Sequence, residues 1–174
     1  MFMTKENNHQ QDRLKKIYKK VKVLYGEVPP QMKFLGDIDA DYLEDFLLSI
    51  SRIARHKHID PDFFGFIRLY VAYREDYPYC KSFNTKLLLS RGFEQSKLDS
   101  AITDIKEIPF DEKHKALGAF AIKAIYESAK CVQDDLDRLF EMGWSQKDIF
   151  DAVEHAGAIL KNGRILTAFG VKSS

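Results

Sequence analysis

The sequence has no run of 18 or more apolar residues, so a helix that crosses a lipid bilayer is not expected. The N-terminal stretch MFMTKENNHQQDRLKK lacks the apolar segment of a secretion signal, and we therefore expect a cytoplasmic protein. Only two of the 174 residues are cysteine, Cys80 and Cys131, too few for the disulfide framework of a small secreted protein. No spacing of Cys and His suits structural zinc, and we expect neither a metal ion nor a cofactor.

A net charge is also nearly absent: the sequence has 27 basic and 26 acidic residues, and its formal net charge is +1. This balance argues against a nucleic-acid partner. Apolar residues make up 45% and charged residues 30%, which is typical of a globular domain with a substantial core. Six basic residues between Arg13 and Lys22 are predicted to form the solvated face of an amphipathic helix. We expect residues 1–27 to extend a domain that covers residues 28–174.

Apolar residues recur with helical spacing almost throughout the chain. The first such stripe is Leu14, Ile17, Tyr18, Val21, Leu24 and Tyr25, and Gly26 ends it. Val28-Pro29-Pro30 is predicted to be an extended linker, because proline disfavours helix at the residue before it. Further helices are predicted from about Asp39, from Pro61, and over residues 80–91, 94–106, 111–129, 132–142 and 145–168. No segment alternates with period two, and the sequence predicts an all-α, single-domain helical bundle.

Two segments match at a constant offset of 51 residues. Leu88, Gly92, Phe93, Gln95, Leu98, Ala101 and Ile102 correspond to Leu139, Gly143, Trp144, Gln146, Ile149, Ala152 and Val153. Each copy reads as a helix, a glycine that ends it, an aromatic residue and a second helix, so the sequence predicts an internal helix-pair repeat. At the same offset Cys80 corresponds to Cys131, each predicted near the start of a short helix.

The segment Tyr77-Pro-Tyr-Cys-Lys-Ser-Phe-Asn84 resembles a motif of the alkylhydroperoxidase D-like / carboxymuconolactone decarboxylase family. There the start of the helix usually reads Cys-x-Tyr-Cys-x-x-x-His. Tyr79 and Cys80 match, whereas Tyr77 stands at the first cysteine and Asn84 replaces the histidine. The resemblance runs from about residue 28 to residue 171. It implies a helical domain of that family and a homo-oligomer, a trimer or a hexamer.

The resemblance also implies a redox chemistry that this sequence keeps only in part. A cysteine at a helix N-terminus is favoured as thiolate, and in the family a second cysteine, a histidine and an upstream glutamate complete the cycle. The glutamate would fall near Gly65, and Asn84 cannot relay protons. The two-cysteine cycle therefore cannot run within this motif. Cys80 remains open to three interpretations: a one-cysteine redox site, a residue lining a small-molecule pocket, or an inert packing residue.

Other candidate site residues carry alternatives of the same kind. His155 is either a general base that faces a pocket or a core histidine. Cys131 is a possible resolving thiol, and Arg164 can bind a carboxylate or pair with an acidic residue across an oligomer interface. The remaining candidates for a pocket lining are Tyr73, Tyr77, Tyr79 and Asn84. His56, His58 and His114 are predicted to be surface residues.

Three functions follow from these observations. The first is an antioxidant peroxidase or thiol oxidoreductase that uses Cys80, a small-molecule substrate and an external thiol reductant. The second is a decarboxylase that does not depend on paired cysteines. The third is a non-catalytic homo-oligomer that binds a small molecule or a protein partner.

Overall fold

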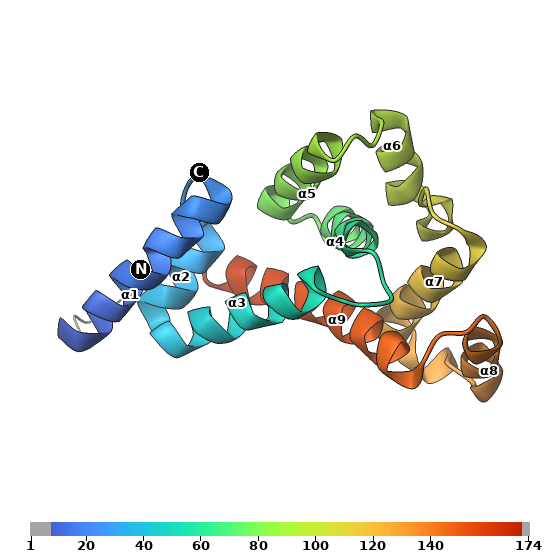
Figure 1. The fold of residues 1–174 in the computed structure, drawn as a ribbon. Helices are drawn as coiled ribbons and strands as arrows, with labels where there is room; N and C mark the ends of the chain where they lie inside the picture. Colours follow the sequence, from blue (N-terminus) through green and yellow to red (C-terminus); the bar gives the residue numbers. More distant parts are fainter. Residues whose placement is uncertain (1–7, 172–174) are drawn as a thin grey trace. The chain divides into compact units, whose positions relative to one another are not determined.

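The computed structural model describes residues 8–171, and this part of the chain is all α-helical, as the apolar spacing predicts (Figure 1). Residues 1–7 of the predicted extension and the side chain of Leu24 lie outside the described residues. The chain divides into two compact units, residues 1–54 with 165–174, and residues 55–164. Within the described part, none of the helices combines the length and the apolar character needed to span a membrane.

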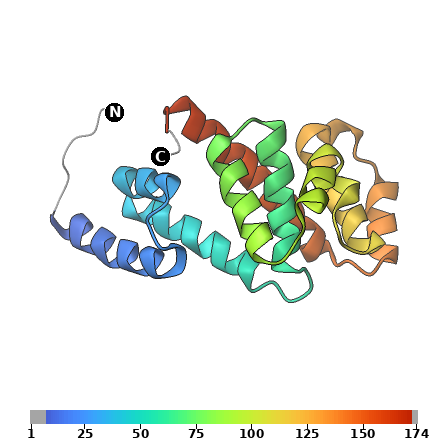
Figure 2. The ribbon, with the colours of Figure 1, turned by 90° about the horizontal axis from the view of Figure 1, so that it is seen from above.

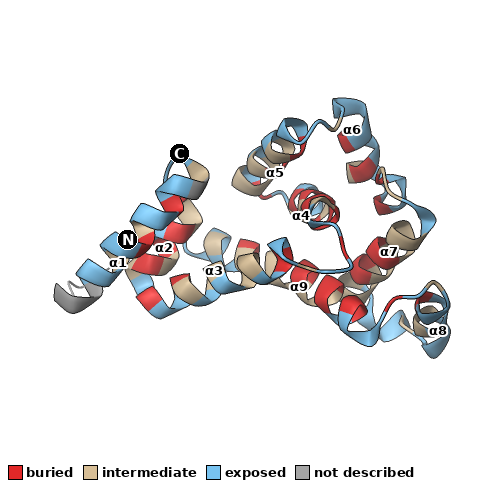
Figure 3. Cartoon of the chain, in the orientation of Figure 1, coloured by how far each residue is buried: buried red, intermediate tan, exposed pale blue. Residues whose placement is uncertain are grey.

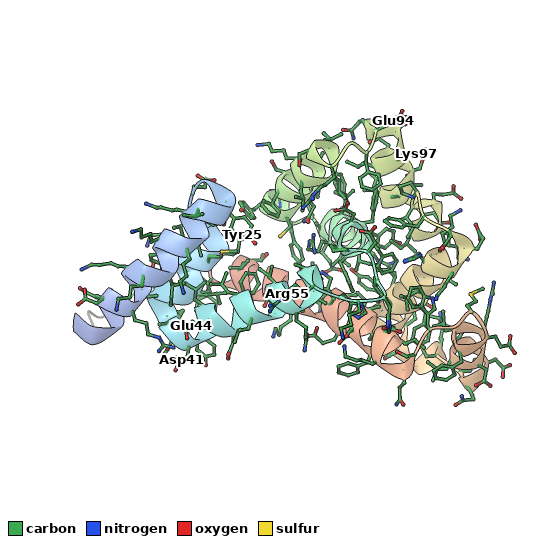
Figure 4. The ribbon with its side chains drawn as sticks, viewed as in Figure 1. Tyr25, Asp41, Glu44, Arg55, Glu94 and Lys97 are labelled. Atoms are coloured by element: carbon green, nitrogen blue, oxygen red, sulfur yellow. The ribbon has the colours of Figure 1, made fainter. Side chains whose placement is uncertain are left out.

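The first unit contains three helices that share one apolar core. They are α1 (Asn8–Tyr25), α2 (Pro30–Ile38) and α3 (Ala40–Ala54). The buried residues of this core are Ile17, Val21, Met32, Ala40 and Leu43. On the surface, Arg13 of α1 pairs with Asp41 and Glu44 of α3, two residues labelled in Figure 4. The basic helix is therefore held by apolar packing on one face and by acidic residues of α3 beside it.

The prediction of an extended linker at Val28-Pro29-Pro30 is wrong at its last residue. Pro29 is extended, with φ −57° and ψ 145°, but Pro30 is the first residue of α2. Proline is well suited to this position, because its fixed φ matches the helix and its missing N–H would have no partner there. The Pro-Pro pair therefore marks the start of a helix that the sequence analysis did not predict.

The second unit is built around α4. Its helices are α4 (Pro61–Arg74), α5 (Pro78–Ser90), α6 (Gln95–Thr103), α7 (Glu112–Tyr126), α8 (Gln133–Glu141) and the greater part of α9 (Gln146–Ala168). Short 3₁₀ turns lie at Ile105–Glu107 and Ser128–Lys130. Figure 1 views α4 end-on among α5, α6, α7 and α9, and Figure 3 colours most of it as buried. Figure 2 shows α4 and α5 side by side.

The start of α4 follows from its sequence. Asp60 caps the helix by accepting a hydrogen bond of 2.8 Å from the Asp62 N–H, and Pro61 is the first helical residue. Beyond the cap, α4 is apolar on nearly all sides, as expected of a helix enclosed by others. This helix supplies both the core of the unit and one residue of the candidate site.

An aromatic cluster packs α4 against α7 and the start of α9. The ring centre of His114 lies 5.5 Å from that of Phe63 and 5.0 Å from that of Trp144. The Trp144 Nε1–H donates a hydrogen bond of 3.0 Å to the Lys113 carbonyl. The prediction of a surface position for His114 is therefore wrong. Its ring is mostly buried, while Nδ1 keeps a contact of 2.6 Å with Asp111 at the helix cap.

The two copies of the predicted repeat form the same turn. Gly92 and Gly143 have φ values of +91° and +84°, which glycine adopts without strain. The Phe93 N–H donates to Leu88 O at 3.2 Å, and the Trp144 N–H donates to Leu139 O at 3.1 Å. This is the Schellman arrangement that closes a helix, so the helix-pair repeat is confirmed in backbone geometry.

Candidate functional site

Cys80 lies in the first turn of α5. Tyr77 is the N-cap, Pro78 the first helical residue and Cys80 the third. The first N–H groups of a helix have no partner within the helix, and the helix dipole is positive at this end. The thiol is half-buried and not part of a disulfide. This placement agrees with the predicted position of Cys80 at a helix start.

A polar network reaches Cys80 from two other helices. Arg68, in the middle of α4, donates from Nε to Asn84 Oδ1 at 2.8 Å. Asn84 in turn donates from Nδ2 to the Cys80 carbonyl at 2.8 Å and is only 2% exposed. The Nη1 atom of Arg68 lies 3.2 Å from His155 Nε2 on α9. The structure therefore brings together Cys80, Asn84 and His155, and Arg68 connects them.

The contact between Arg68 and His155 indicates which nitrogen of the imidazole carries the proton in this structure. A guanidinium has only donors, so a hydrogen bond here requires an unprotonated Nε2 and places the ring proton on Nδ1. The edge of the His155 ring also packs against Phe64, with ring centres 5.0 Å apart. In this arrangement His155 Nε2 is the acceptor for Arg68.

Two opposing effects act on the thiol. Burial raises the pKa of Cys80 above its ordinary value, because the thiolate loses solvation. The positive charge of Arg68 lowers the pKa, but by less, so the pKa stays raised overall. The fraction of thiolate at neutral pH is therefore small, and Arg68 keeps it larger than burial alone would allow.

Tyr77, at the position of the family's first cysteine, is a buried packing residue. Its hydroxyl donates to the Leu160 carbonyl on α9 at 3.3 Å. A methyl group added at Gly163 would overlap the Tyr77 ring, so the absence of a side chain at Gly163 makes room for it. The tyrosine thus attaches the start of α5 to α9.

Of the other predicted pocket residues, Tyr73 and Arg164 are exposed, whereas Tyr79 is half-buried. Tyr79 stacks on Phe83, with ring centres 5.9 Å apart. Tyr73 is exposed, and Lys81 lies 5.0 Å from its ring centre. Arg164 is exposed and lies 3.6 Å from Glu75 of the same chain, whereas its pairing across an oligomer interface stays a prediction.

Cys131 is also a free thiol. It caps the 3₁₀ turn Ser128–Lys130 and precedes Val132, the N-cap of α8, so it lies just outside the helix rather than inside its first turn. The two cysteines correspond in sequence, but only Cys80 occupies a helical position. Only Cys80 therefore has the helix-start environment that favours a thiolate.

A second polar cluster, which the sequence analysis missed, surrounds the start of α9. The His56 Nε2 atom lies 3.2 Å from Asp151, and the His58 Nδ1 atom lies 3.1 Å from Asp148. The side chain of His56 is only 5% exposed, so its predicted surface position is wrong, whereas His58 is exposed as predicted. Lys147 pairs with Asp151, and Ser145 donates to Asp148. Among the described residues, no group of three or more His, Cys, Asp or Glu is arranged to hold a metal ion.

The sequence contains a signal that could have identified Arg68 as a site residue. Arg68 is the one charged residue in the stretch Phe63–Tyr73, which otherwise predicts a buried helix. A charge inside such a helix must find partners, because burying it alone is costly. His56 had no comparable signal, since its partners lie 92 to 95 residues further along the chain.

Comparison with solved structures identifies the fold. A peroxidase-related protein from Silicibacter sp. matches at 17% identity with a TM-score of 0.82, over 94% of this chain and 85% of that one. A peroxidase-related protein with an alkylhydroperoxidase core, from Ralstonia eutropha JMP134, matches at 16% identity with a TM-score of 0.79, over 94% and 86%. The chain therefore has the alkylhydroperoxidase D-like fold.

The same fold carries a further activity. A debrominase solved in complex with 2,3,4-tribromopyrrole matches at 18% identity with a TM-score of 0.73, over 100% of this chain and 92% of that one. No protein-family model matches the sequence, and no curated protein matches it.

Proposed function

We propose that the protein is an alkylhydroperoxidase-like thiol enzyme that reduces a peroxide at the single cysteine Cys80. The observation that carries this proposal is the position of Cys80 in the first turn of α5 with the Arg68 network beside it. The fold supports it, because two solved structures of this fold are peroxidase-related proteins.

The reaction needs one thiol and an external reductant. The Cys80 thiolate attacks one oxygen of the peroxide, the O–O bond breaks, and an alkoxide leaves and takes a proton from water. Cys80 becomes a sulfenic acid. A low-molecular-weight thiol then forms a mixed disulfide with Cys80 and releases water, and a second such thiol restores Cys80 and leaves as the external disulfide.

Tyr77 and Asn84 explain why the resolving thiol comes from outside in this proposal. Tyr77 offers no sulfur, and the Asn84 amide is engaged with Arg68 and the Cys80 carbonyl. Cys131 is a second candidate for the resolving thiol, and the experiment below removes it. His155 serves here as the acceptor for Arg68.

The raised pKa of Cys80 favours a second candidate function. Burial of the thiol lowers its reactivity, which suits a scaffold that binds a small molecule at this site without redox chemistry. The debrominase structure supports this alternative, because it holds a small aromatic molecule in the same fold. In both candidates we propose a cytoplasmic homo-oligomer, a trimer or a hexamer, which light scattering on the purified chain would test.

Alkylation of Cys80 separates the two functions. In a Cys131→Ser variant, Cys80 should react with iodoacetamide in the folded protein, hydrogen peroxide should block this reaction, and dithiothreitol should restore it. A matched Cys80→Ser variant gives the background. A folded protein in which peroxide leaves the alkylation of Cys80 unchanged would exclude the peroxidase and favour the binding scaffold.

A further inference from the structure

The position and contacts of Arg68 are those of a residue that organises a site, and not those of a solvated surface residue. Arg68 lies in the middle of α4, and its neighbours in sequence, Ile67 and Leu69, are fully buried. From there its guanidinium contacts Asn84 on α5 and His155 on α9. Three helices of one unit thus meet at one side chain.

Both contacts leave the positive charge of Arg68 in place. Asn84 and an imidazole with an unprotonated Nε2 are neutral, so neither contact cancels the guanidinium charge. An arginine stays protonated at every pH at which proteins are folded. The charge that Arg68 contributes to this network therefore does not change with pH.

We infer that Arg68 is the positioning residue of the Cys80 site: it joins Asn84 of α5 to His155 of α9 and places a permanent positive charge near Cys80. The inference rests on the proposed function, since it describes how the same thiol is tuned.

The space around Gly65 is consistent with this arrangement. A Cβ at residue 65 would lie 3.6 Å from Arg68 Nη2 and 3.0 Å from a methyl carbon of Leu88. A longer side chain at residue 65 would therefore compete with the guanidinium for the same volume. Glycine at this position and arginine one turn later fit together.

Other ionisable groups near Cys80 need to be considered in a pH experiment. On its own segment these are Tyr77, whose pKa burial raises, and Lys81, which pairs with Asp76. From the helices packed against α5 they are Arg68 and His155. Of these groups, Arg68 is the one whose charge acts appreciably on the Cys80 thiol, and it lowers the thiol pKa.

The test is the pH profile of Cys80 alkylation by iodoacetamide in the full chain carrying Cys131→Ser, comparing Arg68→Met, Arg68→Lys and Arg91→Met. Arg91 is exposed and lies on the far end of α5, about 16 Å along the helix from Cys80 at ~1.5 Å per residue. The Arg91→Met substitution removes the same positive charge, but at a distance from Cys80 where salt screens it. Circular dichroism and thermal melting establish that each variant is folded.

We expect Arg68→Met to shift the alkylation profile to higher pH and to slow the reaction at pH 7 by about threefold to tenfold. Arg68→Lys should restore a large part of the rate, because it restores the charge, and Arg91→Met should leave the profile unchanged. A folded Arg68→Met protein with an unshifted profile would overturn the inference, as would an equal shift in Arg91→Met. If Arg68→Met does not fold, the inference is tested by Arg68→Gln, which can still donate to Asn84 but carries no charge, and an unshifted profile in that variant overturns it.

The outcome is independent of the peroxide experiment. Alkylation measures the thiolate whether or not the protein reduces peroxides. A shift in Arg68→Met together with no oxidation by peroxide would retain the role of Arg68 and reject the peroxidase. Oxidation by peroxide with no shift in Arg68→Met would retain the peroxidase and reject the role of Arg68.

Discussion

Two polar clusters lie along the same face of α9, and they use histidine in opposite ways. Asp148, Asp151 and His155 follow each other at helical spacing and are all buried. At the start of the helix, the Asp148 and Asp151 carboxylates contact His56 and His58. One to two turns later, His155 contacts the guanidinium of Arg68. One end of the helix pairs histidine with anions and the other pairs it with a cation.

The difference indicates which cluster is structural. Carboxylates that receive hydrogen bonds from histidine and from Ser145 satisfy one another and fix the segment before α4 to the start of α9. In the Arg68 cluster, the charge of the guanidinium extends to the thiol of Cys80. We therefore expect substitutions in the first cluster to change stability, and substitutions in the second to change thiol reactivity as well.

Asp148→Ala should have the largest effect. It removes the carboxylate that caps α9 through Ser145 and that pairs with His58, which should lower the free energy of unfolding by about 3 kcal/mol. Urea unfolding measures the change. Asp137→Ala, in an exposed position of α8, is the control and should change stability by about 0.5 kcal/mol or less.

The effect of Asp148→Ala should also depend on pH. Burial raises the pKa of the Asp148 carboxyl, but hydrogen bonds from Ser145 and His58 lower it by a larger amount. The pKa therefore lies below the ordinary 3.8. A lowered pKa means that the carboxylate stabilises the fold above about pH 4 and that this stabilisation is lost as the pH falls through the folded value. The difference between wild type and Asp148→Ala should therefore shrink between pH 7 and pH 3. An equal difference at both pH values would contradict this account.

Gly163→Ala should come second, because the added methyl group overlaps the Tyr77 ring. We expect a loss of about 2 kcal/mol, and a smaller loss when the same change is made in a Tyr77→Ala background. Gly157→Ala is a matched control on the same helix. Its Cβ would lie 3.8 Å from Ile125, an ordinary contact, so it should gain about 0.5 to 1 kcal/mol.

His155→Leu should cost about 1 to 2 kcal/mol, because it removes the acceptor of Arg68 Nη1. His155→Gln keeps an acceptor and should cost less. Unlike Asp148→Ala, both variants should also alter the rate of Cys80 alkylation, which the iodoacetamide assay measures. A rate that is unchanged in both variants would remove the proposed distinction between the two clusters.

Tyr77→Phe should have the smallest effect. It removes only the hydroxyl that donates to Leu160 O at 3.3 Å and keeps the ring against Gly163, so the loss should be below about 1 kcal/mol. Thermal melting of the variant beside wild type is sufficient to measure it. A loss as large as that of Gly163→Ala would mean that the hydrogen bond, rather than the ring, attaches α5 to α9.

Most of the fold could be predicted from the sequence, since apolar spacing and glycine stops are local signals. Gly92 and Gly143 marked two helix ends that the structure reproduces. The start of α2 was missed because the rule that proline disfavours helix at the preceding residue was extended to Pro30 itself, where proline begins a helix. Local signals therefore predict helices well, and they fail where one residue type has two opposite roles.

The candidate site could be predicted only in part. The position of Cys80 at a helix start follows from the residues around it, and so does the loss of the relay at Asn84. The partners of these residues do not, because Arg68 and His155 are 87 residues apart and meet only through the packing of α4 on α9. The buried position of His114 depends likewise on Trp144, which lies 30 residues further along the chain in the turn between α8 and α9.

The fluorescence of Trp144 allows the unfolding of the second unit to be followed without an added label. Trp144 is the only tryptophan of the chain, it is 3% exposed, and it packs against His114 at the turn between α8 and α9. Its emission should therefore be blue-shifted in the folded protein and move to longer wavelength when residues 55–164 unfold. The unit 1–54 with 165–174 has no tryptophan, so fluorescence and circular dichroism recorded together would show whether the two units unfold at the same denaturant concentration.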